Sequence, residues 1–139
     1  MPTAAIRIPV HIKRGRMTHK DNVLNVLQQT EEKRARFLAA WKHGVEFLGA
    51  EFFGPGTPQT ARSKKELTPL KEVIEASFAE ESEGEEQFLA AMVSFYDPAW
   101  GEELAGRIEC HKSLSGLTLD LDHECTEIIC ELLLNHEGW

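Results

Sequence analysis

Seven side chains near the end of the chain carry atoms that can bind a transition metal. These potential ligands are Cys110, His111, His123, Cys125, Glu127, Cys130 and His136. His123 and Glu127 are four residues apart, which places them on one face of a helix. However, the sequence has neither a paired Cys-x-x-Cys nor a His-Glu-x-x-His motif, and Cys125 would point about 160° away from His123 because two residues rotate a helix by ~200°. We therefore expect no metal site, and we interpret Cys125 and Cys130 as structural residues.

Motifs for enzymatic chemistry are also missing from the sequence. It contains no nucleophile elbow, phosphate-binding loop or dinucleotide fingerprint. The segment Gly54-Pro55-Gly56 cannot act as a phosphate loop, because Pro55 and Pro58 lack the backbone N–H groups that would bind the anion. We predict a protein that is not an enzyme and needs no cofactor. A hydrolytic or metal-dependent enzyme is the least favoured alternative.

Charge is distributed unequally along the chain. Residues 1–71 contain thirteen Lys or Arg and six Asp or Glu, whereas residues 72–139 contain two and seventeen. The first part therefore has a net charge of +7 and the second a net charge of −15. Such a division affects partners and encounter rates rather than fold.

The basic residues support nucleic-acid binding as an alternative function. The candidate residues lie in the first part of the chain and in the expected loop, and they are Lys13, Arg14, Arg16, Arg62, Lys64 and Lys65. Side chains of this kind can neutralise phosphates. No helix-turn-helix, zinc finger or aromatic-basic platform accompanies them, and the acidic second part would repel the same polymer. We therefore rank this alternative below protein binding.

Acidic residues and a terminal tryptophan favour a protein partner. The densest acidic cluster consists of Glu80, Glu81, Glu83, Glu85 and Glu86. A field of one sign accelerates association with an oppositely charged partner. Trp139 either docks on the fold or reaches a partner, and the other large aromatic residues either fill the core or contribute to an interface. We predict a regulatory, inhibitory or adaptor protein that binds a basic partner. We also predict a homodimer, formed either by pairing of the oppositely charged halves or by burial of the last helix.

The chain has no segment that would take it into or across a membrane. No apolar run approaches the ~20 residues of a membrane span, and the first residues lack the apolar stretch of a signal peptide. The three cysteines are an odd number, which does not fit a disulfide framework. We predict a cytoplasmic location, and the size and acidity are compatible with a protein of a bacterium, a phage or a mobile element.

The first residues differ from the rest in composition. Residues 1–16 contain four basic side chains and no acidic one, and the helical pattern begins only after Met17. We expect residues 1–17 to form a basic arm that is either disordered or not native, with Met17 as the hypothetical natural start. Residues 18–139 are then expected to form a single helical domain.

Caps and helix-breaking residues divide residues 18–139 into helices. Thr18 can cap the first helix, whose apolar residues recur every three or four positions until Gly54-Pro55-Gly56. The polar residues 28–34 allow either one long helix or two shorter ones. Residues 54–66 are expected to form an exposed loop. Thr68-Pro69 is then expected to start the next helix, with a threonine cap followed by proline.

Further caps predict the remaining helices. The capping residues are Ser82 with Glu85, Asp97 before Pro98, and either Asp120 or Asp122. The last of these helices extends to about Asn135 and is apolar enough to be buried on most of its sides. We predict an all-α fold, a compact bundle of about four to six helices. Residues 5–12 and 117–121 alternate and are compatible with a minor two-stranded element, although we favour an extended lead-in for residues 117–121.

Overall fold

A single long helix opens the described part of the chain. The computed structural model describes residues 18–108 and 121–139, and its contacts separate the chain into two units, residues 1–31 and 32–139. Helix α1 (His19–Leu48) begins in the first unit and ends in the second without interruption. The sequence predicts a domain boundary after residue 17, which differs from the division after residue 31 and stays a prediction.

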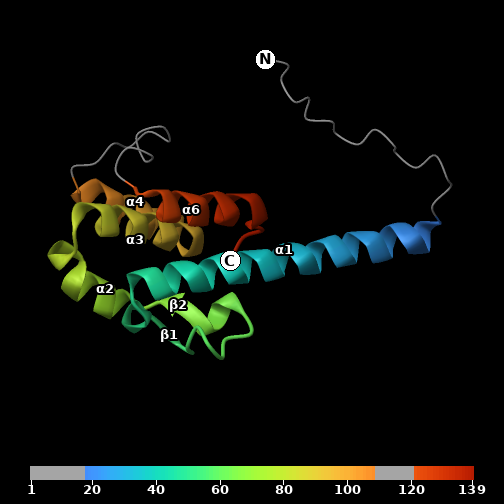
Figure 1. The fold of residues 1–139 in the computed structure, drawn as a ribbon, viewed down its shortest axis with the longest axis horizontal. Helices are drawn as coiled ribbons and strands as arrows, with labels where there is room; N and C mark the ends of the chain where they lie inside the picture. Colours follow the sequence, from blue (N-terminus) through green and yellow to red (C-terminus); the bar gives the residue numbers. More distant parts are fainter. Residues whose placement is uncertain (1–17, 109–120) are drawn as a thin grey trace, which may run out of the picture. The chain divides into compact units, whose positions relative to one another are not determined.

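The other elements all belong to the second unit. In chain order they are η1 (Ala50–Phe52), β1 (Phe53–Pro55), η2 (Lys64–Glu66), β2 (Leu67–Pro69), α2 (Lys71–Ser77), η3 (Phe78–Glu80), α3 (Glu83–Tyr96), α4 (Pro98–Arg107) and α6 (His123–Asn135). Five α-helices and one small antiparallel sheet therefore make up the described residues (Figure 1). The predicted mainly helical fold with a minor two-stranded element is confirmed.

The strands are not the ones predicted. In the sheet Phe53 pairs with Pro69 and Pro55 with Leu67. Residues 5–12 and 117–120 lie outside the described residues, and Leu121 is not in a strand.

Two local predictions around this sheet are wrong. Thr68-Pro69 does not start a helix: both residues are in β2, and α2 begins only at Lys71. The backbone N–H of Leu70 donates to the Phe52 carbonyl at 2.8 Å, which continues the pairing instead. The segment 54–66 is not simply an exposed loop either, because Ala61 is only 3% exposed. Proline after threonine fits a strand at the edge of a sheet as well as a helix start, so the local signal was ambiguous.

The helix caps agree with the sequence at four places. In each case the side-chain oxygen of the cap accepts a hydrogen bond from the backbone N–H three residues later: Thr18 from Asp21 at 3.2 Å, Ser82 from Glu85 at 3.3 Å, Asp97 from Trp100 at 3.2 Å and Asp122 from Cys125 at 2.8 Å. A cap of this kind satisfies one of the backbone N–H groups that the first turn leaves unpaired. Asp122, rather than Asp120, caps the last helix.

The core of residues 32–139 is built around Trp41 of α1. Its side chain is fully buried, and its indole N–H donates to the Leu67 carbonyl of β2 at 2.8 Å. Its ring meets those of Phe53 and Trp139 with centroids 5.8 and 4.9 Å apart. Within these residues the sheet and helix α6 lie along different sides of α1 (Figure 1). On the side of α6, His43 of α1 bonds Glu124 at 2.8 Å. Aromatic packing and one buried hydrogen bond thus join α1 to the sheet and the chain end.

The composition of helix α6 predicts burial on most of its sides, and this prediction is wrong. Leu132 is fully buried and Ile128 nearly so, but Leu133 and Leu134 are 54% and 69% exposed. Helix α2 behaves similarly, because Ile74 is buried while Val73 is 37% exposed. In both helices one face meets the core, and apolar residues outside that face remain in solvent.

Candidate functional site

The predicted acidic cluster surrounds the start of helix α3. Glu80 ends η3, Glu81 precedes the cap Ser82, and three more acids lie in the first turn of α3. Carboxylates at a helix N-terminus are stabilised by the helix dipole. This local role accounts for acids in the first turn of α3, but Glu80 and Glu81 precede the helix and require another explanation.

The Glu81 carboxylate is held close to other acids. A hydrogen bond with Glu85 raises its pKa, with further contributions from partial burial and from the charges of Glu51 and Glu80, so that this pKa is about 7. Burial and the charge of Glu83 also raise the pKa of Glu86. Two carboxylates that share a proton near neutral pH can exchange that proton for a cation. Glu81 and Glu86 are therefore acids whose charged forms are disfavoured in the fold.

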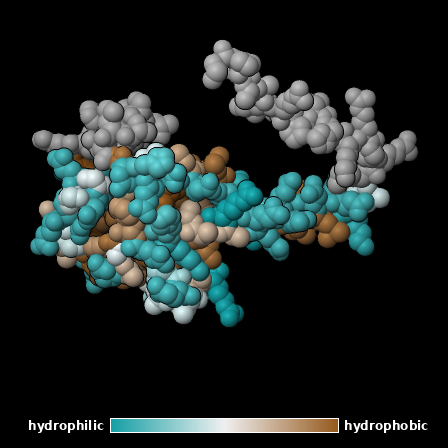
Figure 2. All heavy atoms as spheres, viewed as in Figure 1, coloured by the Kyte–Doolittle hydropathy of each residue, from teal (hydrophilic) through white to brown (hydrophobic). Residues whose placement is uncertain are grey.

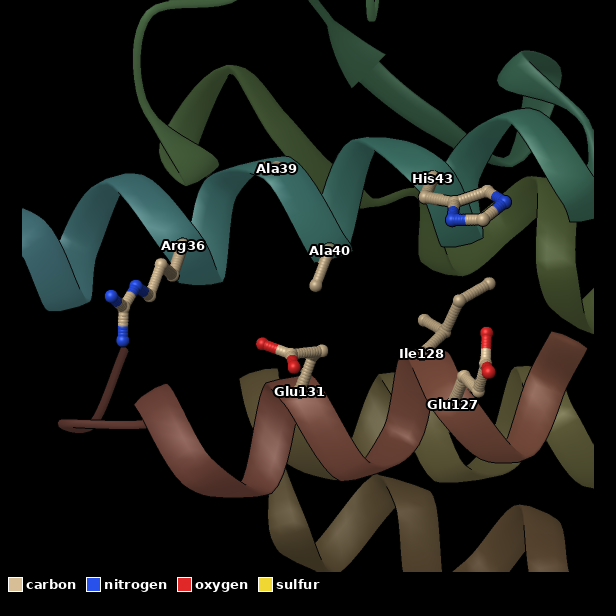
Figure 3. Close-up of a pocket in the computed structure, with 7 residues that line it drawn as sticks. All are labelled: Arg36, Ala39, Ala40, His43, Glu127, Ile128 and Glu131. Carbon is tan, nitrogen blue, oxygen red and sulfur yellow. The ribbon is translucent and has the colours of Figure 1, made fainter.

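A groove lies between α1 and α6 in residues 32–139. It has a volume of about 290 Å³ and is lined by Arg36, Ala39, Ala40, His43, Glu127, Ile128 and Glu131. Figure 3 shows Ile128 and Glu131 extending from α6 toward Ala40 of α1. The floor is apolar and both rims are charged, so the groove suits a mixed apolar and polar contact.

His43, which lines the groove, pairs with a carboxylate of α6. His43 Nε2 lies 2.8 Å from Glu124 Oε1, and both side chains are about half exposed. The residues that line the groove include no Ser, Thr or Cys. We describe the pair of His43 and Glu124 as a surface ion pair linking the two helices.

The potential metal ligands, for which the sequence predicts no metal site, are only partly within the described residues. His123 and Glu127 do meet, at 2.8 Å, and both are largely exposed. Burial and a hydrogen bond with Asp122 raise the pKa of the Cys125 thiol to about 12, which disfavours the thiolate that metals bind. In the part of the chain that the structure describes, no three His, Cys, Asp or Glu side chains converge as a metal site would require. Cys110 and His111 lie outside that part.

Trp139, the predicted partner-binding tryptophan, packs on the core of its own chain. It is half-buried, and its ring centroid lies 4.9 Å from that of Trp41 and 5.1 Å from that of Tyr96. Lys64 holds the same segment: its ammonium group lies 5.1 Å from the Trp139 ring centroid and donates to the Gly138 carbonyl. Of the two roles that the sequence allowed for Trp139, this geometry favours docking.

The candidate nucleic-acid residues within the described part of the chain differ in their environments. Arg62 and Lys65 are exposed, whereas Lys64 is partly buried against aromatic rings. Burial is the largest of the causes that lower the pKa of Lys64. Lys13, Arg14 and Arg16 lie outside the described residues. Only Arg62 and Lys65 of the predicted set are therefore shown as available to phosphates.

The large aromatic residues mostly fill the core. Trp41, Phe52, Phe53 and Trp100 are each at most 5% exposed. Phe47, at 36%, is more exposed. Most of the large aromatic residues therefore stabilise the fold.

Sequence reasoning missed an apolar surface on the first part of α1. Val23, Leu24, Val26 and Leu27 are 43–60% exposed, and Figure 2 shows brown side chains among teal ones on this segment. A shallow hollow of about 230 Å³ is lined by His19, Asn22, Val23, Val26 and Leu27. Leu24 and Leu27 belong to the apolar repeat from which the sequence predicts a packed face of the first helix. The polar residues 28–34 lie between them and the later apolar residues of the helix, and this interruption is the sequence signal that distinguishes the two segments.

Comparisons with known proteins add no relative. Among residues 18–108 and 121–139, none of the helices combines the length and the apolarity that crossing a membrane requires. Neither the family models, nor the curated proteins, nor the solved structures with which the chain was compared contain a match to it.

Proposed function

We propose that the protein acts by binding a basic protein partner through its acidic cluster, Glu80, Glu81, Glu83, Glu85 and Glu86. The observation that carries this proposal is the crowding of Glu81 against Glu85, which raises the pKa of Glu81 to about 7. Lysine or arginine side chains would relieve that crowding, because they replace a shared proton with a fixed positive charge. A regulatory, inhibitory or adaptor role in the cytoplasm is consistent with such binding.

Three further observations support a binding protein of this kind. The net charge is −8, so a basic partner would be attracted over a distance set by ionic strength. The groove between α1 and α6 combines charged rims with an apolar floor. Cys125 and Cys130 are free thiols, as in proteins of a reducing compartment.

A synthetic octa-arginine peptide can test the cluster against two variants of equal charge. The first replaces Glu80, Glu81 and Glu85 with Gln, and the second replaces Glu124, Glu127 and Glu131 of α6 with Gln. We expect titration calorimetry at low salt to show at least a tenfold weaker affinity for the first variant than for the second. Equal loss in both would show that overall charge, not this cluster, attracts the peptide.

Proton release provides an independent test of contact between the peptide and Glu81. Because the pKa of Glu81 is about 7, binding of a cation at pH 7 should release up to about half a proton per site. Calorimetry in two buffers of different ionisation enthalpy measures this number. Binding without proton release would mean that the peptide does not contact Glu81.

Nucleic-acid binding remains the alternative, supported by the exposed Arg62 and Lys65. A filter-binding assay with DNA and RNA at low salt tests it, since phosphate contacts weaken steeply as salt increases. Retention that is sensitive to salt and lost in the Arg62→Ala/Lys65→Ala variant would favour the alternative. Absence of retention would leave protein binding as the better account.

A further inference from the structure

The last residues of the chain leave helix α6 and pack on the core of the second unit. Residues 136–139, which we call the latch, have no regular secondary structure, and Figure 1 shows them running from α6 toward α1. Within the described residues, none of their backbone N–H groups bonds a backbone carbonyl. The Gly138 carbonyl instead accepts a hydrogen bond from the Lys64 ammonium group. Side chains, rather than backbone pairing, therefore hold the latch in place.

His136 is a polar residue of the latch whose ring enters an aromatic environment. The ring centroid lies 5.6 Å from that of Phe37 in α1 and 5.1 Å from that of Phe95 in α3. The Nδ1 atom is buried and, in the part of the chain that the structure describes, has no hydrogen-bond partner. A buried polar atom without a partner costs free energy. The neutral ring limits this cost, because its single proton can reside on Nε2 and leave no donor at Nδ1.

A positive charge lies close to the His136 ring. The Lys64 ammonium group of η2 is 5.1 Å from the centroid of the Phe37 ring, on which His136 also packs. Burial and the charge of Lys64 both lower the pKa of His136. The other titratable side chains on the elements around the latch have contacts of their own: Arg34 of α1 pairs with Glu137, Tyr96 of α3 contacts Trp139, and Glu131 of α6 accepts from Asn135. A charged His136 would thus lie beside Lys64 among aromatic rings.

We propose that residues 136–139 are a pH-sensitive latch, which leaves the core when His136 binds a second proton. The imidazolium ring has N–H groups at both nitrogens, so one donor would be buried at the unpartnered Nδ1, and a positive charge would face the Lys64 ammonium group. Departure of the latch places His136 in water and uncovers the rings of Phe37 and Trp41. This device goes beyond the proposed partner binding, because the latch does not include the acidic cluster.

The direction of the pH effect follows from the two environments of His136. In the released latch its pKa has the ordinary value of about 6.5, whereas in the docked latch its pKa is lowered. Well above pH 6.5 the ring is neutral in both forms, and the docked latch keeps its full stability. As pH decreases below about 6.5 the released form binds a proton that the docked form does not. The ratio of released to docked latch should therefore increase by up to about tenfold per pH unit.

Nuclear magnetic resonance of the three tryptophan indole N–H groups tests the latch in the full chain. The Trp139 signal is assigned by its loss in Trp139→Phe. Lowering the pH from about 7.5 to about 5 should move this signal toward the position of an exposed indole, with a midpoint below about pH 6.5. The indole N–H of Trp100 donates to Glu75 at 2.9 Å, and its signal should stay in place, which verifies that the core remains folded.

Two single substitutions assign the pH effect to one histidine. His136→Phe keeps an aromatic ring against Phe37 and Phe95 but cannot bind a proton, so its Trp139 signal should stay at the docked position at the lowest pH. The matched control is His43→Phe, which removes a half-exposed histidine that pairs with Glu124. This control should release the latch over the same pH range as the wild type.

Three results would overturn the proposal. They are a Trp139 signal that stays docked in the wild type down to about pH 5, a transition that survives in His136→Phe, and a transition in which the Trp100 signal is lost together with that of Trp139, since this means unfolding of the core. The C2 proton of His136 in the wild type provides a second measurement that holds even if His136→Phe does not fold. Its titration should coincide with the movement of the Trp139 signal, and a midpoint at or above about pH 6.5 would contradict the latch. Failure of octa-arginine binding would not affect these tests, because the latch and the acidic cluster share no residue.

Discussion

Helix α1 contains two apolar segments with opposite environments. Val45, in the second unit, is fully buried, whereas Val23, in the first, is 43% exposed. The buried segment has neighbours that come from later in the chain, such as Leu67 and Trp139 around Trp41. Apolar periodicity thus indicates which face of a helix can pack, but elements from elsewhere in the chain decide whether that face is buried or stays exposed.

The largest expected effect comes from placing a charge in each environment. Leu132→Asp puts a carboxylate at a fully buried site and should lower the free energy of unfolding by more than about 4 kcal/mol. Leu24→Asp, at a site that is 55% exposed, should change the unfolding of the core by less than about 0.5 kcal/mol. Urea unfolding followed by tryptophan fluorescence measures both, and similar losses would remove the distinction between the segments.

A smaller effect should come from two glycines of helix α4. A Cβ at Gly101 would lie 2.5 Å from Ser94 Cα of α3, whereas at Gly106 no atom lies within 4 Å. We expect Gly101→Ala to cost about 2 kcal/mol, because backbone must move, and Gly106→Ala to stabilise by up to about 1 kcal/mol through helix propensity. Thermal unfolding of the two variants checks how tightly α3 and α4 pack, and a neutral Gly101→Ala would contradict the close approach.

The chain end should behave as part of the core. Trp139→Ala removes the ring that contacts Trp41 and Tyr96 and should lower the free energy of unfolding by about 2 kcal/mol. Trp139→Phe, which keeps an aromatic ring, should lose less than half of that. If Trp139→Ala left stability unchanged but weakened binding to a partner, Trp139 would belong to an interface instead.

The smallest effect concerns the pH dependence of stability. The pKa of Glu81 is raised from 4.5 to about 7 in the folded protein, so the fold binds a proton that the unfolded chain has already released between these values. Stability from this group is therefore complete below about pH 4.5 and is lost as pH increases to about 7.

Replacing either Glu81 or Glu85 should remove this loss of stability at high pH. Glu81→Gln and Glu85→Gln should each stabilise the protein at pH 8 by about 0.5 kcal/mol, a value reduced by solvent screening, and by less at pH 4. Melting temperatures at the two pH values measure the difference. A gain that is equal at both pH values would show that Glu81 and Glu85 do not share a proton.

Much of the fold could be predicted where the signals are local. Ser82, Asp97 and Asp122 each bond a backbone N–H only three residues away, so their role is visible within a short window of sequence. The pairing of β1 with β2 joins residues such as Gly54 and Thr68, and no short window contains both strands. The Thr68-Pro69 prediction failed for this reason.

The candidate site was predictable in composition but not in geometry. The acidic cluster is visible in the sequence, whereas the contact of Glu81 with Glu85 and the contribution of Glu51 from η1 depend on the fold. Lys64 looked equivalent to Arg62 and Lys65, yet its ammonium group lies over the Phe37 and Trp139 rings. Side-chain environments of this kind involve residues more than twenty-five positions apart.

The sequence by itself determined the helices, their caps and the unequal distribution of charge, because these depend on residues close together in the chain. Only the tertiary structure decided that Leu132 is buried while Leu134 is exposed, that Trp139 docks beside Trp41, and that Val23 and Val26 remain in solvent. The physical reason is that burial is set by the neighbours that a side chain meets in space. Adjacent leucines on one helix can therefore have opposite roles.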